Sequence, residues 1–331
     1  MADVYNITKT ETKTGNFIPV HLDSLRVDSL LSFDLYIRKG IEYILYRASN
    51  LPFTEEKRDN LLKYNVRALY ISGENCHQYQ EYLESNIKEI IADPTIEPTA
   101  KANIVYDSAK LLVQDVLDKP TLPENIRRSK NLVDSTVSFI LTGQTAFHSL
   151  LRVMSFDYYT YTHCVNVCTF SLAMAQFSGI DSEDELCSLG TGALLHDVGK
   201  TLIPEAILKK RSSLSDREWD LIRKHPQSGV DILKETNMIS DESYFPVLQH
   251  HEREDGSGYP NGLKSDEIHI HSKIVAIADV YDAMTTKRVY RSAIAPYLAL
   301  KEVFDQGEVF DQQLLKNFTQ MMGPGNWSQS T

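Results

Sequence analysis

The sequence predicts a mainly α-helical chain of 331 residues, in which a small N-terminal α+β module precedes a larger all-helical domain. Strand-like runs occupy the first 90 or so residues, Pro94 and Pro98 then break the pattern, and apolar residues recur at helical spacings to about residue 320. We therefore expect the module at 1–95, a helical linker at 96–145, the domain at 146–320 and a tail at 321–331.

The expected module combines strands with one short helix. β-Branched and aromatic runs, which favour strands, occur at 17–22, 32–37, 42–46 and 68–71. Lys39-Gly40 is typical of a turn, and Thr54 ahead of Glu55 is typical of a helix start. Because this region has no cluster of metal ligands or nucleophile-base pairs, we expect it to modulate the domain that follows.

Composition excludes several classes of protein. Asp and Glu outnumber Lys and Arg by 45 to 34, and this net charge of −11 argues against general nucleic-acid binding and against an anionic membrane surface. No apolar stretch approaches the roughly 20 residues of a membrane span, and the polar N-terminus lacks a signal core. The four cysteines form no CxxC pair, and Cys164 and Cys168 are expected to be small core residues. We expect a cytoplasmic protein.

The first unusual feature is His196-Asp197 at the end of the apolar run 192–195. An imidazole and a carboxylate delivered together by an apolar helix are costly to bury without partners. One metal ion would partner both groups, whereas a hydrogen-bonded core pair is the simpler explanation of the dipeptide alone. Asp279 raises the same question, because it lies within the apolar run 274–280.

Four further histidines extend this pattern. His250-His251 follows the apolar stretch 244–248, and both metal ligation and an exposed helix end fit such a pair. His163 is expected to begin a helix, and His225 taken alone is typical of a protein surface. Sets of histidines and carboxylates suit zinc, iron or manganese, and spacing alone does not select among these metals.

Taken in order, these residues resemble the pattern of one known family. The pattern consists of His163, His196-Asp197, Lys200, His225-Pro226, His250-His251, Asp255-Gly256-Ser257-Gly258-Tyr259-Pro260 and Asp279. It is similar in content and order to the HD-GYP family, a branch of the HD-domain phosphohydrolases, from about residue 150 to about 312. The Gly-Tyr-Pro loop after a double histidine is highly specific.

The resemblance implies an all-helical HD-GYP domain that hydrolyses cyclic di-GMP to pGpG, GMP or both. It also implies two divalent metal ions that activate a bridging water, with iron or manganese preferred and zinc as the alternative. The implied ligands are His163, His196, Asp197 and Asp279 for the first metal and His225, His250 and His251 for the second, with Asp197 bridging the pair.

The resemblance assigns further roles around the metals. Lys200 would act beside Asp197 in catalysis and in substrate binding by offsetting charge on the phosphoryl oxygens, whereas its alternative is a solvated lysine at a helix end. Arg288 and Arg291 carry planar forks that suit phosphate, whereas their alternative is a surface basic pair. The expected loop-shaping residues are Asp255, Gly256, Gly258, Tyr259 and Pro260.

Three positions depart from the family's pattern. In a trinuclear subgroup, a Glu four residues before the first histidine holds an extra metal, and this chain has Tyr159 there, so we expect a binuclear centre. Glu254 stands where a bulky apolar or aromatic residue is common, and His269 stands where proline is common. These two changes affect the expected geometry of the loop and the fit of a substrate.

The expected function is therefore that of a cyclic di-GMP phosphodiesterase in bacterial signalling. The main alternative is a weakly active or inactive HD-GYP module that senses cyclic di-GMP or binds a protein, and the complete ligand set favours catalysis over it. Another alternative keeps the metals and assigns a different phosphoester. Signalling proteins are expected partners through the Gly-Tyr-Pro loop or the N-terminal module.

Overall fold

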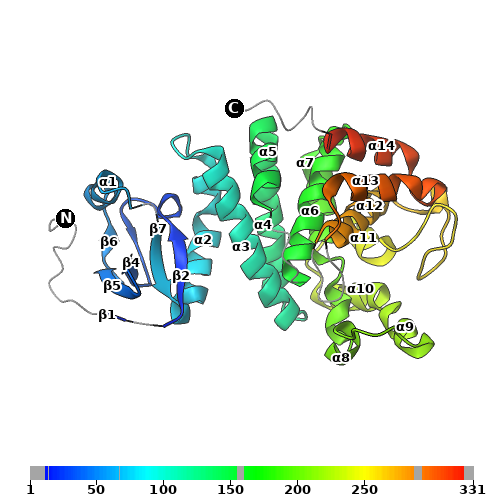
Figure 1. Cartoon of the computed structure of the whole chain (residues 1–331), viewed down its shortest axis with the longest axis horizontal. Helices are drawn as coiled ribbons and strands as arrows, with labels where there is room; N and C mark the ends of the chain where they lie inside the picture. Colours follow the sequence, from blue (N-terminus) through cyan, green and yellow to red (C-terminus); the bar gives the residue numbers. More distant parts are fainter. Residues whose placement is uncertain (1–11, 14, 67, 155–159, 287–292, 324–331) are drawn as a thin grey trace. The chain divides into compact units, whose positions relative to one another are not determined.

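The computed structural model describes residues 12–13, 15–66, 68–154, 160–286 and 293–323 (Figure 1). The chain divides into two compact units, residues 1–108 and 109–331. The division falls within α3 (Pro98–Asp118), so the domain borders expected at 95, 145 and 320 remain predictions. The predicted fold class, mainly helical with a small N-terminal α+β part, is confirmed.

The first unit is built on a five-stranded antiparallel sheet of order β1-β5-β4-β7-β2, with a separate β3-β6 pair (Figure 1). The strands are β1 (Thr12–Lys13), β2 (Phe17–His21), β3 (Ser29–Leu30), β4 (Leu35–Lys39), β5 (Glu42–Arg47), β6 (Pro52–Phe53) and β7 (Ala68–Ser72). Alternation along β7 buries Leu69 and Ile71, which share one core with Leu83 and Ile90 of α2 (Cys76–Ala92). The sheet therefore buries one face against a helix.

The expected strand at 32–37 begins three residues later than its composition suggested. Asp34 precedes β4, and its carboxylate accepts hydrogen bonds from the Ser49 backbone at 2.6 Å and from the Tyr36 hydroxyl at 3.3 Å. The expected turn at Lys39-Gly40 is confirmed, since Gly40 has φ of 64° between the paired β4 and β5. Thr54 precedes α1 (Glu55–Lys63), although its side chain makes no capping hydrogen bond.

Apart from the isolated bridge between Asp255 and Lys264, the regular secondary structure described in the second unit is helical. Its helices after α3 are α4 (Pro123–Leu141), α5 (Gln144–Val153), α6 (Thr160–Phe177), α7 (Glu183–Leu195), α8 (Glu205–Leu208), α9 (Asp216–Ile222), α10 (His225–Thr236), α11 (Tyr244–Gln249), α12 (Ile270–Thr285), α13 (Pro296–Asp305) and α14 (Gln312–Met321). Residues 162–175 of α6 are buried on every side, as expected of a central helix. Edge-to-face contacts among Phe170, Tyr281 and Phe318 join α6, α12 and α14.

The chain approaches itself closely where α7 ends. The short 3₁₀ helix η4 (Val198–Leu202) follows Asp197 and packs against α10. A Cβ on Gly199 would lie 2.0 Å from the His225 carbonyl oxygen, so only glycine permits this approach. The approach holds the His196-Asp197 pair next to His225. Cys164 and Cys168 are buried, which confirms them as core residues.

Hydropathy gives one further result. Across the described ranges, we find no helix with both the length and the apolar character that a membrane crossing requires.

Candidate metal centre

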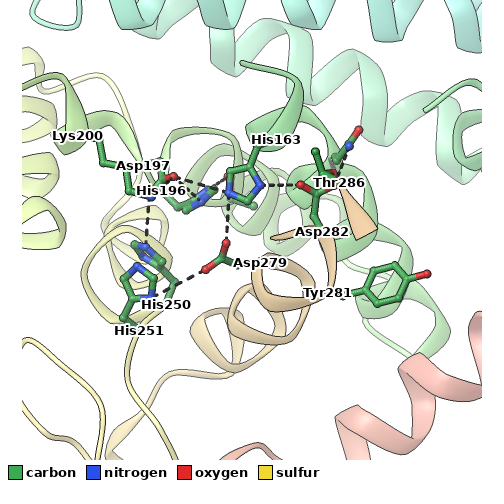
Figure 2. Close-up of polar contacts among 12 residues, drawn as sticks. His163, His196, Asp197, Lys200, His250, His251, Asp279, Tyr281, Asp282 and Thr286 are labelled. Carbon is green, nitrogen blue, oxygen red and sulfur yellow. Dashed lines mark hydrogen bonds and ion pairs between the residues drawn. The ribbon is translucent and has the colours of Figure 1, made fainter. Parts of the chain in front are cut away.

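Five helices bring the predicted ligands to one place in the second unit (Figure 2). His163 lies on α6, His196-Asp197 follows α7, His225 begins α10, His250-His251 follows α11, and Asp279 lies on α12. Their ligand atoms form two groups that share one carboxylate. These groups are His163, His196 and Asp197, and Asp197, His225, His250 and His251.

Asp197 stands between the two groups and turns one oxygen to each. Its Oδ2 lies 3.7 Å from His163 Nε2 and 3.5 Å from His196 Nε2. Its Oδ1 lies 3.4 Å from His225 Nε2 and 3.7 Å from His250 Nε2. One carboxylate is therefore placed to serve both groups.

Asp279 also reaches both groups. Its Oδ1 lies 3.2 Å from His163 Nε2, and its Oδ2 lies 3.9 Å from His251 Nδ1 (Figure 2). The resemblance places Asp279 with the first metal alone, whereas its two oxygens face one histidine of each group. The structure thus brings together all seven predicted ligands.

Hydrogen bonds orient four of the five imidazoles. In each, Nδ1 lies against an acceptor that has no proton to give, so Nδ1 carries the proton and Nε2 points into the cluster. The acceptors are Asp282 Oδ2 at 2.7 Å for His163, the Ala193 carbonyl at 2.7 Å for His196, the Ile222 carbonyl at 2.6 Å for His225 and the Pro246 carbonyl at 2.8 Å for His250.

The orientation of these rings fits a bound cation. His225 Nε2 and His250 Nε2 lie 3.2 Å apart, and with both protons on Nδ1 the two lone pairs face each other. His196 Nε2 and Asp197 Oδ1 are buried and have no hydrogen-bond partner among the described residues. Unpaired buried acceptors are costly, and divalent metals that take nitrogen and oxygen ligands would satisfy them. The donor set therefore fits divalent metal ions.

Burial and nearby charges keep most of these side chains in the protonation state that binds metal ions. Burial, together with the nearby Lys200 charge, lowers the pKa of His225 to about 4, and burial with the neighbouring His251 lowers that of His250. Burial opposes ionisation of Asp197, but Lys200 Nζ at 2.6 Å from Oδ2 holds its pKa well below the usual range. Neutral imidazoles and ionised carboxylates are the forms that bind metals.

His163 differs from the other ligands in its protonation. Burial opposes its charge, but hydrogen bonds to Asp279 and Asp282 raise its pKa to about 9. In the metal-free chain its Nε2 therefore holds a proton toward Asp279 Oδ1, 3.2 Å away. A metal bound at this nitrogen would replace that proton.

Asp282 is a site residue that sequence reasoning missed. It is fully buried; its Oδ2 accepts from His163 Nδ1, and its Oδ1 accepts from Asn166 Nδ2 at 2.7 Å and Thr286 Oγ1 at 3.2 Å. Its spacing of three from Asp279 on one helix was an available signal, because residues at that spacing share a face.

The Gly-Tyr-Pro loop folds directly over His251. Tyr259 donates its backbone N–H to the His251 carbonyl at 3.2 Å, and its ring stacks on the His251 ring at 4.6 Å. A Cβ on Gly258 would lie 2.4 Å from the Glu252 Cα, so glycine permits the contact. Glu252, which sequence reasoning also missed, accepts from the Asn261 and Leu263 backbones at 2.7 and 3.0 Å.

The rest of the loop is held by local contacts. Asp255 Oδ1 accepts from the Ser257 backbone and hydroxyl at 2.9 and 2.6 Å, Gly256 has φ of 81°, and Pro260 follows a cis peptide bond. Glu254, one of the departures, pairs with Lys273 at 3.1 Å.

His269, the other described departure, lies at the start of α12. It accepts from the His271 backbone at 3.2 Å, and its ring stacks on Phe245. Tyr159, Arg288 and Arg291 lie outside the described residues, so the expectations on them remain predictions.

A cavity of about 1000 Å³ opens beside the cluster. Its walls include His163, Asp197, Lys200, His251 and Tyr259. Known ligand pockets span roughly 300–1,000 Å³, so the cavity lies at the upper end of that range. Buried carboxylates and imidazoles beside such a cavity suit metal-assisted hydrolysis of a phosphoester.

Comparison with known proteins gives the following likenesses. The HD domain family matches residues 155–314. The chain is 36% identical over 196 residues to cyclic di-GMP phosphodiesterase PA4108 of Pseudomonas aeruginosa, covering 59% of this chain and 47% of that protein. It is 39% identical over 132 residues to the cyclic di-GMP phosphodiesterase response regulator RpfG of Xanthomonas campestris pv. campestris, covering 39% and 35%.

A further relative acts on a different cyclic dinucleotide. The chain is 36% identical over 159 residues to 3'3'-cGAMP-specific phosphodiesterase 2 of Vibrio cholerae, covering 47% of this chain and 30% of that protein. The chain thus spans less than half the length of these three curated relatives. The solved structure of Bd1817, a HDG"Y"P protein from Bdellovibrio bacteriovorus, shares the fold with a TM-score of 0.63 and 24% identity, over 93% of this chain and 99% of that one.

Proposed function

We propose that this chain, in which residues 155–314 match the HD domain family, is an HD-GYP protein that hydrolyses the phosphodiester bonds of cyclic di-GMP with two divalent metal ions, giving pGpG, GMP or both. The position of Asp197 carries this proposal. A carboxylate with one oxygen toward each of two imidazole groups is the arrangement that a bridged metal pair requires. The curated relatives named for cyclic di-GMP support the substrate.

In this proposal His163, His196, Asp197 and Asp279 would hold one metal, and His225, His250 and His251 would hold the second together with Asp197. Iron or manganese is preferred, with zinc as the alternative. When bound, the metals supply Lewis acidity and a lowered pKa for water. Among the described residues, Lys200 adds positive charge at the cavity wall, where it can offset charge on phosphoryl oxygens.

Two arginines that lie outside the described residues complete the proposal. Arg288 and Arg291 bind the phosphates of the substrate through their planar forks. The N-terminal unit modulates activity, and signalling proteins bind at it or at the Gly-Tyr-Pro loop.

Turnover of cyclic di-GMP by the metal-loaded chain tests the proposal. Purified protein is loaded anaerobically with Fe²⁺ or Mn²⁺, incubated with cyclic di-GMP, and the products are separated by chromatography. We expect linear pGpG or GMP with wild type and neither with Asp197→Ala. Tight binding without turnover would favour the alternative of a cyclic di-GMP sensor.

A second substrate has support of its own. One relative is named for 3'3'-cGAMP, which differs from cyclic di-GMP in one base. The same assay with 3'3'-cGAMP therefore compares the two dinucleotides by kcat/KM. A higher value for 3'3'-cGAMP would reassign the substrate while keeping the chemistry.

A further inference from the structure

Helix α9 carries large apolar side chains that the core of the second unit does not use. None of its seven residues is buried, although Trp219 and Ile222 lie on it. The Trp219 side chain is 44% exposed and lines the cavity, as do Ile222 and Leu214. An exposed tryptophan in a cavity wall is the kind of apolar surface that ligands cover.

The segment that holds Trp219 is fixed by its own hydrogen bonds. Glu218 accepts from Lys210 Nζ at 2.8 and 2.6 Å, and from the Ser215 backbone and hydroxyl at 2.7 and 2.9 Å. Ser215 and Glu218 form a capping box at the start of α9. Trp219 is therefore presented by an ordered turn, which lowers the entropy lost when a ligand contacts it.

This wall is also linked to the metal centre. The Ile222 carbonyl at the end of α9 accepts from His225 Nδ1 at 2.6 Å. His251 and Tyr259 line the same cavity as Trp219. A molecule with its phosphate at the cluster can therefore extend other parts of its structure toward α9.

We propose that Trp219 forms a base-stacking subsite that takes one guanine of the dinucleotide, with Ile222 and Leu214 beside it. The inference rests on the proposed function, in which the metals and cationic groups take the phosphates. The bases are flat and weakly polar on their faces, and an indole ring offers a matching surface. Stacking of a base on an aromatic side chain tolerates any base, so this subsite provides affinity and leaves the choice of base to other contacts.

Substitution on α9 tests the subsite by steady-state kinetics with cyclic di-GMP and by metal analysis. We expect Trp219→Ala to raise KM roughly 5- to 150-fold with kcat and metal content unchanged, because stacking is made equally in the ground and transition states. Trp219→Phe should keep most of the affinity. Leu221→Ala is the matched control, since Leu221 is 41% exposed on the same helix and is not among the cavity-lining residues.

Fluorescence gives a second measurement that does not depend on turnover. The chain has two tryptophans, Trp219 and Trp327, so Trp327→Phe leaves Trp219 as the single reporter. Guanine stacked on the indole should quench its emission as cyclic di-GMP is added, whereas inorganic phosphate should leave it unchanged. Quenching with a KM effect in Trp219→Ala supports the subsite.

Two failures are distinguishable. If wild-type, metal-loaded protein neither binds nor hydrolyses cyclic di-GMP, the proposed function is wrong and the subsite has no ligand. If wild type hydrolyses cyclic di-GMP but Trp219→Ala retains its KM, or Trp219 emission does not respond, the subsite alone is wrong. Should Trp219→Ala lose metal or fold poorly, the Trp219→Phe kinetics and the Trp327→Phe titration still decide the question.

Discussion

Replacing Asp282 by asparagine removes a negative charge beside His163 while changing the volume of the side chain very little. In the native chain Asp282 Oδ2 lies 2.7 Å from His163 Nδ1, and both residues are buried. The carboxylate fixes the proton on Nδ1 and makes the ring a stronger base, so that Nε2 offers its lone pair to a metal. The amide of asparagine supplies no charge for this purpose.

The neighbouring donors would also determine which way the side-chain amide of the asparagine points. Asn166 Nδ2 and Thr286 Oγ1 lie 2.7 and 3.2 Å from Asp282 Oδ1 and both can donate, so the oxygen of an asparagine would turn toward them. Its NH₂ group would then face His163 Nδ1 and move the ring's proton to Nε2. A protonated Nε2 cannot bind a metal.

The expected loss of metal affinity follows from the role of residues that, like Asp282, hydrogen-bond to a metal ligand. Losing one typically costs 10- to 100-fold in metal affinity, or about 1.4–2.7 kcal/mol. We expect Asp282→Asn to lose metal affinity in this range. Asn166→Ala is the control, because it removes a neutral donor from the same carboxylate and should cost about fivefold or less.

Manganese titration against a chelator of known affinity measures both variants, with circular dichroism to verify folding. Wild-type affinity for both metals in a folded Asp282→Asn protein would refute the reasoning. An equal loss in Asn166→Ala would show that the effect comes from local packing and that the charge of Asp282 is not its cause.

Three further predictions concern other parts of the second unit. Asp197→Ala should lose both metals and His251→Ala mainly one, as measured by metal analysis, because Asp197 has an oxygen toward each group whereas His251 belongs to one group. Arg288→Ala with Arg291→Ala should keep the metals but weaken cyclic di-GMP binding in calorimetry, most steeply at low salt, and unchanged affinity would remove both from the site. Burial and the neighbouring His269 lower the pKa of His271 to about 4, below an unfolded value of about 6.5. Its neutral form therefore contributes stability that is complete above pH 6.5 and is lost toward pH 4, by about 2–3 kcal/mol. His271→Leu should flatten the melting temperature of metal-free protein over this range, and an unaltered acid slope would count against the assignment.

Sequence reasoning identified the residues that the structure brings into one cluster, but it did not identify the residues that orient them. His196, Asp197 and Asp279 were visible because each interrupts an apolar run, where a charged or polar group needs a reason. Asp282 lies in the same kind of run, yet its partner His163 is 119 residues away. Only the packing of α12 against α6 brings the two residues together, and a single sequence does not specify that packing.

The part of the cavity wall formed by α9 could not be predicted from the sequence for a similar reason. Trp219 lies in a polar stretch, Ser215–Asp220 by sequence, where one aromatic residue is unremarkable on a surface. Its proposed role depends on its position in the wall of a cavity that His251 and Tyr259, from a different part of the chain, also line. In the first unit, Asp34 shortened an expected strand because its side chain competes for backbone hydrogen bonds, an effect that β-propensity does not include.

Of the four imidazoles oriented by a hydrogen bond from Nδ1, three have their acceptor only three or four residues earlier in the chain. His196 donates to a carbonyl three residues earlier, His225 to one three earlier, and His250 to one four earlier. Each acceptor lies in the last turn of a helix, and the Pro246 carbonyl also accepts from the His250 backbone N–H at 3.2 Å. A histidine placed just past a helix end can therefore donate its Nδ1–H to a carbonyl of the last turn, which leaves Nε2 pointing away from that helix. Carbonyls at helix ends thus orient three of the predicted ligand rings, whereas His163, in the first turn of α6, is oriented by a carboxylate that is distant in sequence.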